Sequence, residues 1–286
     1  MKKELMQPTL SGQGTYPAKL FLLLLGGAFL AAFYPVWASL VNVWANSDDY
    51  SHGFAILPLV GYILWGRRDR LRAAARPGSA VGLVLATGAL LLYLLARIGE
   101  ILTLAPLAMV LFLAGAVLYL SGFTVLRECA FPLLLLLFMI PLPAQIYAAL
   151  TLPLQLVVTR ISVTLISWGG IPVINDGNVI HLPAQSFQVV EACSGLRSLT
   201  SLLLLGAVLG YFTLRSGLLR LLLFSAALPV AILVNIARVV VLMVASYFFS
   251  LDLTEGTPHT LLGLGVFALA LGLLLLLQKG LVRWER

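Results

Sequence analysis

Charged residues are scarce in this chain. They account for 10% of its 286 residues, whereas hydrophobic residues account for 61%. Because soluble domains carry about a quarter of their residues as charged ones, a soluble globular protein is excluded. Apolar stretches long enough to cross a bilayer recur from end to end, which predicts an all-α integral membrane protein. No stretch is long and polar enough for a separate soluble domain, so we expect residues 1–286 to form a single polytopic membrane domain.

Acidic residues are also few, 11 against 18 basic residues, and the net charge is +7. A basic chain can bind nucleic acid, but here the basic residues lie in short segments between the apolar runs, as in cytoplasmic loops of membrane proteins. We therefore expect no nucleic-acid partner, and both chain termini in the cytoplasm. The basic segments contain Arg67, Arg68, Arg70, Arg72 and Arg76, then Arg215 and Arg220, then Lys279, Arg283 and Arg286.

The apolar runs predict about eight transmembrane helices. Residues 152–168 are apolar but interrupted by polar side chains, so we expect a helix buried against the bundle or lying at the outer interface. Residues 169–192 predict a short extended, hairpin-like outer segment, because Asn-Asp-Gly-Asn at 175–178 is a tight-turn sequence. The expected spans are 20–43, 54–65, 79–96 and 101–120, a fifth that begins after Glu128, then 193–212, 218–244 and 259–277.

Cysteine is nearly absent, with 2 residues in the whole chain. Cys129 lies at the inner end of the fifth expected span and Cys193 at the outer start of the sixth, so a disulfide between them is excluded by distance. A thiol-redox protein is disfavoured, because Cys193 has no second cysteine on its side of the membrane. We interpret Cys129 as a small buried side chain. Cys193 differs, because it lies where a polar segment meets a long apolar run.

Two other polar residues are expected at the depth of Cys193. His259 begins the eighth span at its outer end. Arg238 lies about twenty residues after the inner end of the seventh, which corresponds to ~30 Å, or one hydrocarbon thickness. A cation within a span is costly and suggests function. The structural alternatives are a buried filler for Cys193, a helix cap for His259 and a side chain reaching the interface for Arg238.

The three residue types together predict acyl transfer from a peptide carbonyl. A thiolate is a nucleophile, and a neighbouring cation or a helix N-terminus lowers its pKa. Histidine can take the thiol proton and return it to a leaving amine. Arginine stays protonated and is suited to stabilising an oxyanion. No metal or cofactor is expected, because the outward-facing acidic and histidine residues lack the spacing of a metal site; these are Asp48, Asp49, His52 and His181.

Other polar residues are candidates for support of this site. Asn235, one turn before Arg238, could orient its guanidinium or pack against another helix. Glu191 could orient the histidine or form an ion pair with Arg197 or Arg238, and we favour the structural ion pair.

At these residues the chain resembles the exosortase/archaeosortase family of integral membrane cysteine transpeptidases. The resemblance is carried by Glu-Ala-Cys-Ser-Gly-Leu-Arg-Ser at 191–198, Asn-Ile-Ala-Arg at 235–238, and His259 on a late span. Ser-His-Gly-Phe at 51–54 is similar to the bacterial members. The resemblance implies Cys193 as nucleophile, His259 as general acid/base, and Arg238 as the group that stabilises thiolate and oxyanion. The residues implied in support are Glu191, Ser194, Arg197 and Asn235.

The family also implies a substrate, a partner class and a location. Its partners are exported proteins with a C-terminal sorting tail: a Pro-Glu-Pro-type motif, a transmembrane helix and a basic end. The location is the bacterial cytoplasmic (inner) membrane, with the active site on the periplasmic side. Such a tail would enter laterally from the membrane lipid, between loop 46–54 and segment 169–192. A glutamate in its motif would find arginine partners. The candidate substrate-binding residues are Arg160, His52 and His181.

A transporter or an assembly component for polysaccharide export, without peptidase activity, is the alternative. There Arg238 and His259 would line a substrate path, and polar residues would be distributed through the depth of the membrane. In this sequence the polar residues gather toward one face instead. A non-catalytic assembly subunit stays open, and activity that survives loss of Cys193 would favour it.

Overall fold

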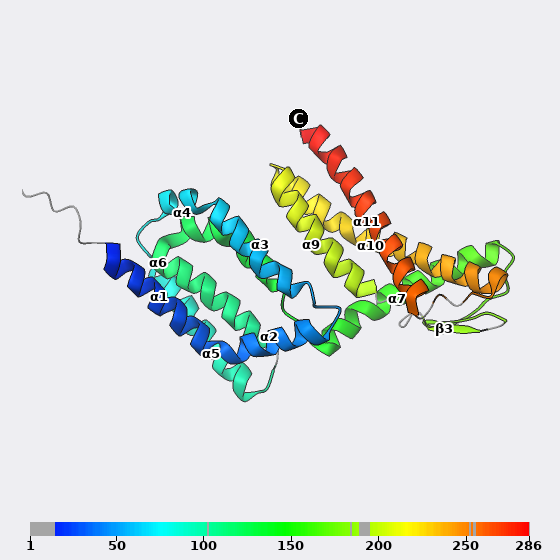
Figure 1. Ribbon diagram of the computed structural model, residues 1–286, viewed down its shortest axis with the longest axis horizontal. Helices are drawn as coiled ribbons and strands as arrows, with labels where there is room; N and C mark the ends of the chain where they lie inside the picture. The colour runs from blue at the N-terminus through cyan, green and yellow to red at the C-terminus, as the bar shows by residue number, and fades with distance from the viewer. Residues whose placement is uncertain are drawn as a thin grey trace, which may run out of the picture.

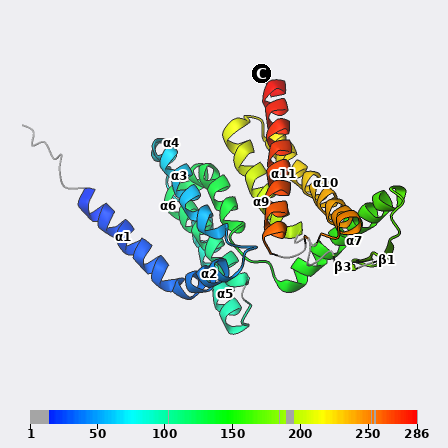
Figure 2. The same cartoon turned by 45° about the vertical axis from the view of Figure 1, so that its right-hand side comes forward.

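The computed structural model describes residues 15–101, 103–183, 185–188, 195–251, 253 and 256–285. Within these residues the chain forms apolar helices and one small sheet, in two bundles that lie side by side (Figures 1 and 2). We call residues 15–140 the N-terminal bundle and residues 144–285 the C-terminal bundle. The C terminus lies at the same end of the molecule as α4, the short helix of the arginine-rich segment.

The first expected span is bent. It consists of α1 (Thr15–Ala32) and α2 (Tyr34–Asn46), whose axes differ by 66° across Phe33. Proline at the start of α2 explains the break, because Pro35 has no N–H to donate to the preceding turn. The chain then returns through α3 (Gly53–Gly66) to α4 (Arg68–Ala74).

Close backbone packing joins α5 (Ala80–Ile98) to α6 (Leu104–Leu137). A Cβ atom added to Gly82 would lie 2.2 Å from the backbone nitrogen of Tyr119. Small residues at such contacts let transmembrane helices approach closely. Helix α6 contains both the fourth and the fifth expected spans, separated at Gly122, where φ is +81° and the helical backbone is interrupted.

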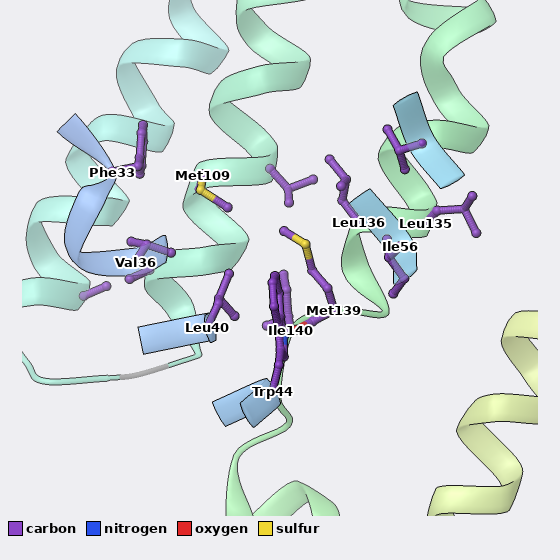
Figure 3. Close-up of a cluster of buried hydrophobic side chains, with 14 of the residues drawn as sticks. Phe33, Val36, Leu40, Trp44, Ile56, Met109, Leu135, Leu136, Met139 and Ile140 are labelled. Carbon is purple, nitrogen blue, oxygen red and sulfur yellow. Dashed lines mark hydrogen bonds between the residues drawn. The ribbon is translucent and has the colours of Figure 1, made fainter. Parts of the chain in front are cut away.

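The core of the N-terminal bundle forms where the bent helix meets α3 and both parts of α6 (Figure 3). Phe33, Ile56 and Met139 are fully buried there. The indole N–H of Trp44 donates a hydrogen bond to the Met139 carbonyl at 2.9 Å, which ties α2 to the end of α6. Further apolar side chains from α9, including Leu204 and Val208, pack against this core and join the two bundles.

The C-terminal bundle consists of α7 (Ala144–Trp168), α9 (Gly195–Thr213), α10 (Gly217–Phe249) and α11 (Gly256–Glu285). Helix α10 packs against the other three. A three-stranded antiparallel sheet lies beside α7, with strands β1 (Ile174–Asp176), β2 (Val179–His181) and β3 (Ser186–Gln188). Ile180 and Phe187 face each other across β2 and β3, and both are buried in a cluster with Val158 and Met243. The sheet is therefore held against α7 and α10 by apolar packing.

The multi-pass helical class is confirmed. The number of helices long enough to cross a membrane in the described part of the chain is smaller than the eight spans expected from the sequence. Among the described residues, five helices are long and apolar enough to cross a membrane, or six if the bent α1–α2 pair counts as one span. Two of the eight expected spans correspond to the shorter apolar helices Gly53–Gly66 and Ser198–Thr213. About 20 residues are needed to cross the hydrocarbon core. From the sequence, residues 152–168 were expected either to be buried against the bundle or to lie at the outer interface. They belong to helix α7, which is long and apolar enough to cross a membrane.

Candidate active site

Helices α10 and α11 bring Arg238 and His259 into direct contact. Nη2 of Arg238 lies 3.0 Å from Nε2 of His259. Because a guanidinium only donates hydrogen bonds, Nε2 is the acceptor of this bond. Nδ1 of the same ring lies 3.3 Å from the Leu253 carbonyl and is the nitrogen that carries the proton. These contacts therefore fix the imidazole ring from both sides, with Nε2 directed at Arg238.

Arg238 is a buried cation. The residue is 8% exposed, and its Nε has no hydrogen-bond partner among the described residues. Gly263 of α11 faces the guanidinium, and a Cβ atom there would lie 3.7 Å from Nη2. A charge taken out of water is stabilised only by partners that replace its hydration. Unfilled donor capacity at this position is suited to binding a carbonyl or carboxylate oxygen.

A small cavity lies between α7, α9 and α10, in the part of α10 that precedes Arg238. Its volume is about 30 Å³, which is room for one or two water molecules. Asn235 lines it, three residues before Arg238 and so on the same side of α10. Thr151, Gln155 and Leu199 complete part of the wall. Asn235 thus faces a space shared by three helices.

A polar stripe on α7 was not assigned a role from the sequence. Gln155, Thr159 and Ser162 are four and three residues apart, which places them on one helix face. Thr159 and Ser162 are fully buried, and the side-chain oxygens of all three residues have no hydrogen-bond partner among the described residues. Each unpaired buried polar group costs about 1–3 kcal/mol. The sequence does carry a signal for this stripe, because its polar residues interrupt an otherwise apolar helix at intervals of about one turn.

The stripe belongs to a part of α7 that packs near α10, since Gln155 lines the same cavity as Asn235 of α10. Val158, next to Thr159, belongs to the same buried cluster as Val239, next to Arg238. Helices α7 and α10 pack along one another. Unpaired polar atoms at a helix interface mark a place for a polar ligand or for water.

The motif around the predicted nucleophile is only partly described. Cys193, Glu191 and Ser194 lie outside the described residues. The described part of α9 begins at Gly195, two positions after Cys193, and Arg197 is in its first turn. Helix α9 packs against α7, α10 and α11.

The three candidate substrate-binding residues lie apart from the Arg238–His259 pair in their described contacts. Nε2 of His52 donates to the Phe138 carbonyl at 3.0 Å, within the N-terminal bundle. His181 Nδ1 lies 2.7 Å from the Ser186 hydroxyl, across β2 and β3. Arg160 is exposed on α7.

The two segments expected to enclose a substrate are both anchored. The phenol oxygen of Tyr50 accepts a hydrogen bond from the Leu142 amide at 3.0 Å, which fixes loop 46–54 to the entry of α7. Gln185 donates to the Ser246 hydroxyl, which fixes the segment before β3 to α10. Among the described residues, no group of three or more histidine, cysteine or acidic side chains is arranged to hold a metal ion.

These residues define a multi-pass helical membrane protein with a part-buried arginine–histidine pair between two late helices. The chain belongs to the transmembrane exosortase family. The family model of that description matches residues 44–276, a range that includes loop 46–54, the sheet and the Arg238–His259 pair. No curated protein and no solved structure matches the chain.

Proposed function

We propose that this chain is a membrane-embedded cysteine transpeptidase that cleaves the C-terminal sorting tail of exported proteins at the periplasmic face of the bacterial cytoplasmic membrane. The observation that carries the proposal is the part-buried hydrogen bond between Arg238 and His259. Family membership supports it, since the family resemblance implies this activity. Cys193 is the proposed nucleophile, His259 the general acid/base, and Arg238 the oxyanion-stabilising group.

In the proposed reaction Cys193, His259 and Arg238 account for each proton transfer and for the bond that breaks. The Cys193 thiol transfers its proton to His259, and the sulfur attacks the peptide carbonyl carbon. Arg238 donates to the oxyanion that forms. His259 then gives the proton to the amine of the departing tail as the C–N bond breaks, leaving a thioester on Cys193. Water or another nucleophile releases the acyl group and restores the thiol.

The hydrogen bond in the resting pair imposes an order on these events. Nε2 of His259 accepts from Arg238, so its lone pair is engaged until the guanidinium turns away. A substrate carbonyl oxygen is the natural new acceptor for Arg238. We infer that substrate binding frees the base, so that the thiol loses its proton only when a carbonyl is in position.

The orientation follows from the charge distribution. Arg220 and Arg238 are 18 residues apart in α10, or about 27 Å at ~1.5 Å per residue. Arg220 lies at the end of the molecule where the other basic segments lie, which the positive-inside rule assigns to the cytoplasm. The proposed active site is then periplasmic. A sorting tail with a basic cytoplasmic end would present its motif at the same depth.

The polar stripe of α7 is proposed to bind the extended backbone of the motif. The Thr159→Val variant is expected to be as stable as wild type or slightly more stable, because an unpaired buried hydroxyl is removed. Processing is expected to fall about 5-fold, for loss of roughly 1 kcal/mol of substrate binding. Thr164→Val on the exposed side of the same helix is the matched control. Equal processing by the two variants at equal membrane levels would rule out a role for Thr159 in binding.

Hydroxylamine trapping tests the proposed acyl transfer. Purified chain in vesicles is incubated with a tagged sorting-tail protein and increasing hydroxylamine, and the new C terminus is measured by mass spectrometry. A thioester intermediate is expected to yield a hydroxamate, because hydroxylamine attacks the acyl carbon and releases the thiol. Cleavage that gives only a carboxylate at every hydroxylamine concentration would contradict an acyl-enzyme. No cleavage at all would contradict the peptidase function.

A further inference from the structure

A second cavity lies between the two bundles, near the cytoplasmic end in the orientation proposed above. Its volume is about 550 Å³. One end is lined by Arg67, Arg127, Arg220 and Glu128, and the rest of the wall is almost entirely apolar, from α6 on one side and α9 and α10 on the other. We call this cavity the basic crevice. Arg220, which lines it, is about 27 Å along α10 from Arg238, so the crevice is distinct from the proposed active site.

The basic end of the crevice is an ordered cluster. Nη1 of Arg67 donates to Oε2 of Glu128 at 2.8 Å. The guanidinium carbons of Arg67 and Arg220 lie 4.9 and 5.6 Å from the centre of the Tyr211 ring. Phe131 stacks on the same ring at 3.9 Å between centroids. Aromatic faces hold guanidinium groups in place while leaving their N–H groups free to bind an anion.

The charges of the crevice do not cancel. Three arginines and one glutamate line it, which leaves a net charge of +2. Glu128 is engaged with Arg67, and Arg127 is exposed. Positive charge in excess at one end of an otherwise apolar cavity favours a ligand with a negative head and an apolar body.

The length of the apolar walls indicates how long the apolar part of the ligand can be. Leu134 of α6 and Leu221 of α10 are 57% and 59% exposed, and both line the crevice with Phe138 and Phe224. Glu128 and Phe138 are ten residues apart, which is ~15 Å along a helix. This length suits one leaflet of hydrocarbon, which is about half of a ~30 Å core.

We propose that the basic crevice binds one anionic phospholipid from the cytoplasmic leaflet, a ligand that the transpeptidase reaction does not require. Its phosphate lies between Arg127 and Arg220, and its acyl chain runs along Leu134 and Leu221. Basic clusters between transmembrane helices on the cytoplasmic side are suited to anionic headgroups. The basic end of a sorting tail is disfavoured here, since it would be repelled by the net charge. Free phosphate would leave the exposed apolar walls uncovered.

Native mass spectrometry of the full chain tests the proposal. The protein is purified in detergent, depleted of lipid, and titrated with an equimolar mixture of phosphatidylglycerol and phosphatidylethanolamine. Wild type is expected to retain one phosphatidylglycerol in preference to phosphatidylethanolamine. The double variant Arg127→Gln/Arg220→Gln is expected to bind phosphatidylglycerol about 30-fold more weakly, since two arginines near an anionic headgroup are removed.

Two further variants separate the crevice from general surface charge. Arg70→Gln/Arg283→Gln removes the same charge from exposed sites outside the crevice and is expected to leave binding unchanged. Leu134→Trp narrows the apolar part without changing charge and is expected to lower retention of the lipid. Equal loss in the two arginine double variants, unchanged binding by Leu134→Trp, or equal retention of the two lipids by wild type would each overturn the proposal. None of these measurements depends on peptidase activity.

Discussion

Replacing Cys193 with alanine is expected to abolish processing of a sorting-tail substrate. The change removes only the sulfur, so no thioester can form and water would have to attack the peptide bond directly. Loss of a covalent nucleophile costs about 10⁴-fold or more in rate. The measurement is the appearance of processed substrate on a gel when tagged substrate and transpeptidase are expressed together at matched membrane levels.

Cys129→Ala is the matched control for this experiment. Cys129 is the other cysteine of the chain, buried in α6 within the N-terminal bundle. Its variant is expected to process the substrate at close to the wild-type rate. Processing that persists in Cys193→Ala would remove the nucleophile from the proposed mechanism. It would favour the transport or assembly component for polysaccharide export, in which Arg238 and His259 act without a thiol.

The approach of Arg238 to His259 was predictable from the sequence. The end of one expected span and a short loop separate the two residues in the chain, so the sequence predicts that they lie at a similar depth. The rise per residue of α10 sets the depth of Arg238. The structure adds what spacing could not give, namely which nitrogen atoms meet and that Nε2 of His259 is the acceptor.

Other features depend on interactions that no local pattern specifies. The apolar run at 20–43 reads as one continuous span, yet the chain turns by 66° at Phe33, and this side chain is buried in the core. The fourth and fifth expected spans form one helix that is interrupted at Gly122. The φ of +81° at this glycine changes the direction of the chain without a loop. Hydropathy measures how long an apolar segment is, whereas packing against distant helices determines where the segment bends.

For the polar residues, too, a local sequence pattern does not specify contacts with distant parts of the chain. Gln155 and Thr159 are visible in the sequence as interruptions of an apolar helix, but the packing of α7 against α10, far along the chain, is not. His52 and His181 were grouped with the site because they belong to outer segments. Their described contacts instead join α3 to α6 and β2 to β3. Membrane side alone therefore does not predict which of these residues contact Arg238 or His259.

Arg238→Ala is expected to lower the processing rate about 10³-fold. Loss of one oxyanion-hole donor costs about 10²–10³-fold in other acyl-transfer enzymes, and the imidazole of His259 also loses the contact that orients its ring. Arg238→Lys is expected to recover part of the rate, because it keeps the positive charge but not the forked donor geometry. Arg97→Ala, at an exposed arginine in the last turn of α5, is the control and should process normally.

A double-mutant cycle distinguishes cooperation within the pair from two separate effects. If Arg238 frees and orients His259 while it binds the carbonyl oxygen, the two residues act in one step. The double variant Arg238→Ala/His259→Ala should then be little worse than the more damaged single variant, because residues that act as a unit are strongly non-additive. Rate losses that multiply across the two single variants would mean that Arg238 acts independently of the base. The resting hydrogen bond would then be structural, and the proposed order, with carbonyl binding before thiol deprotonation, would be wrong.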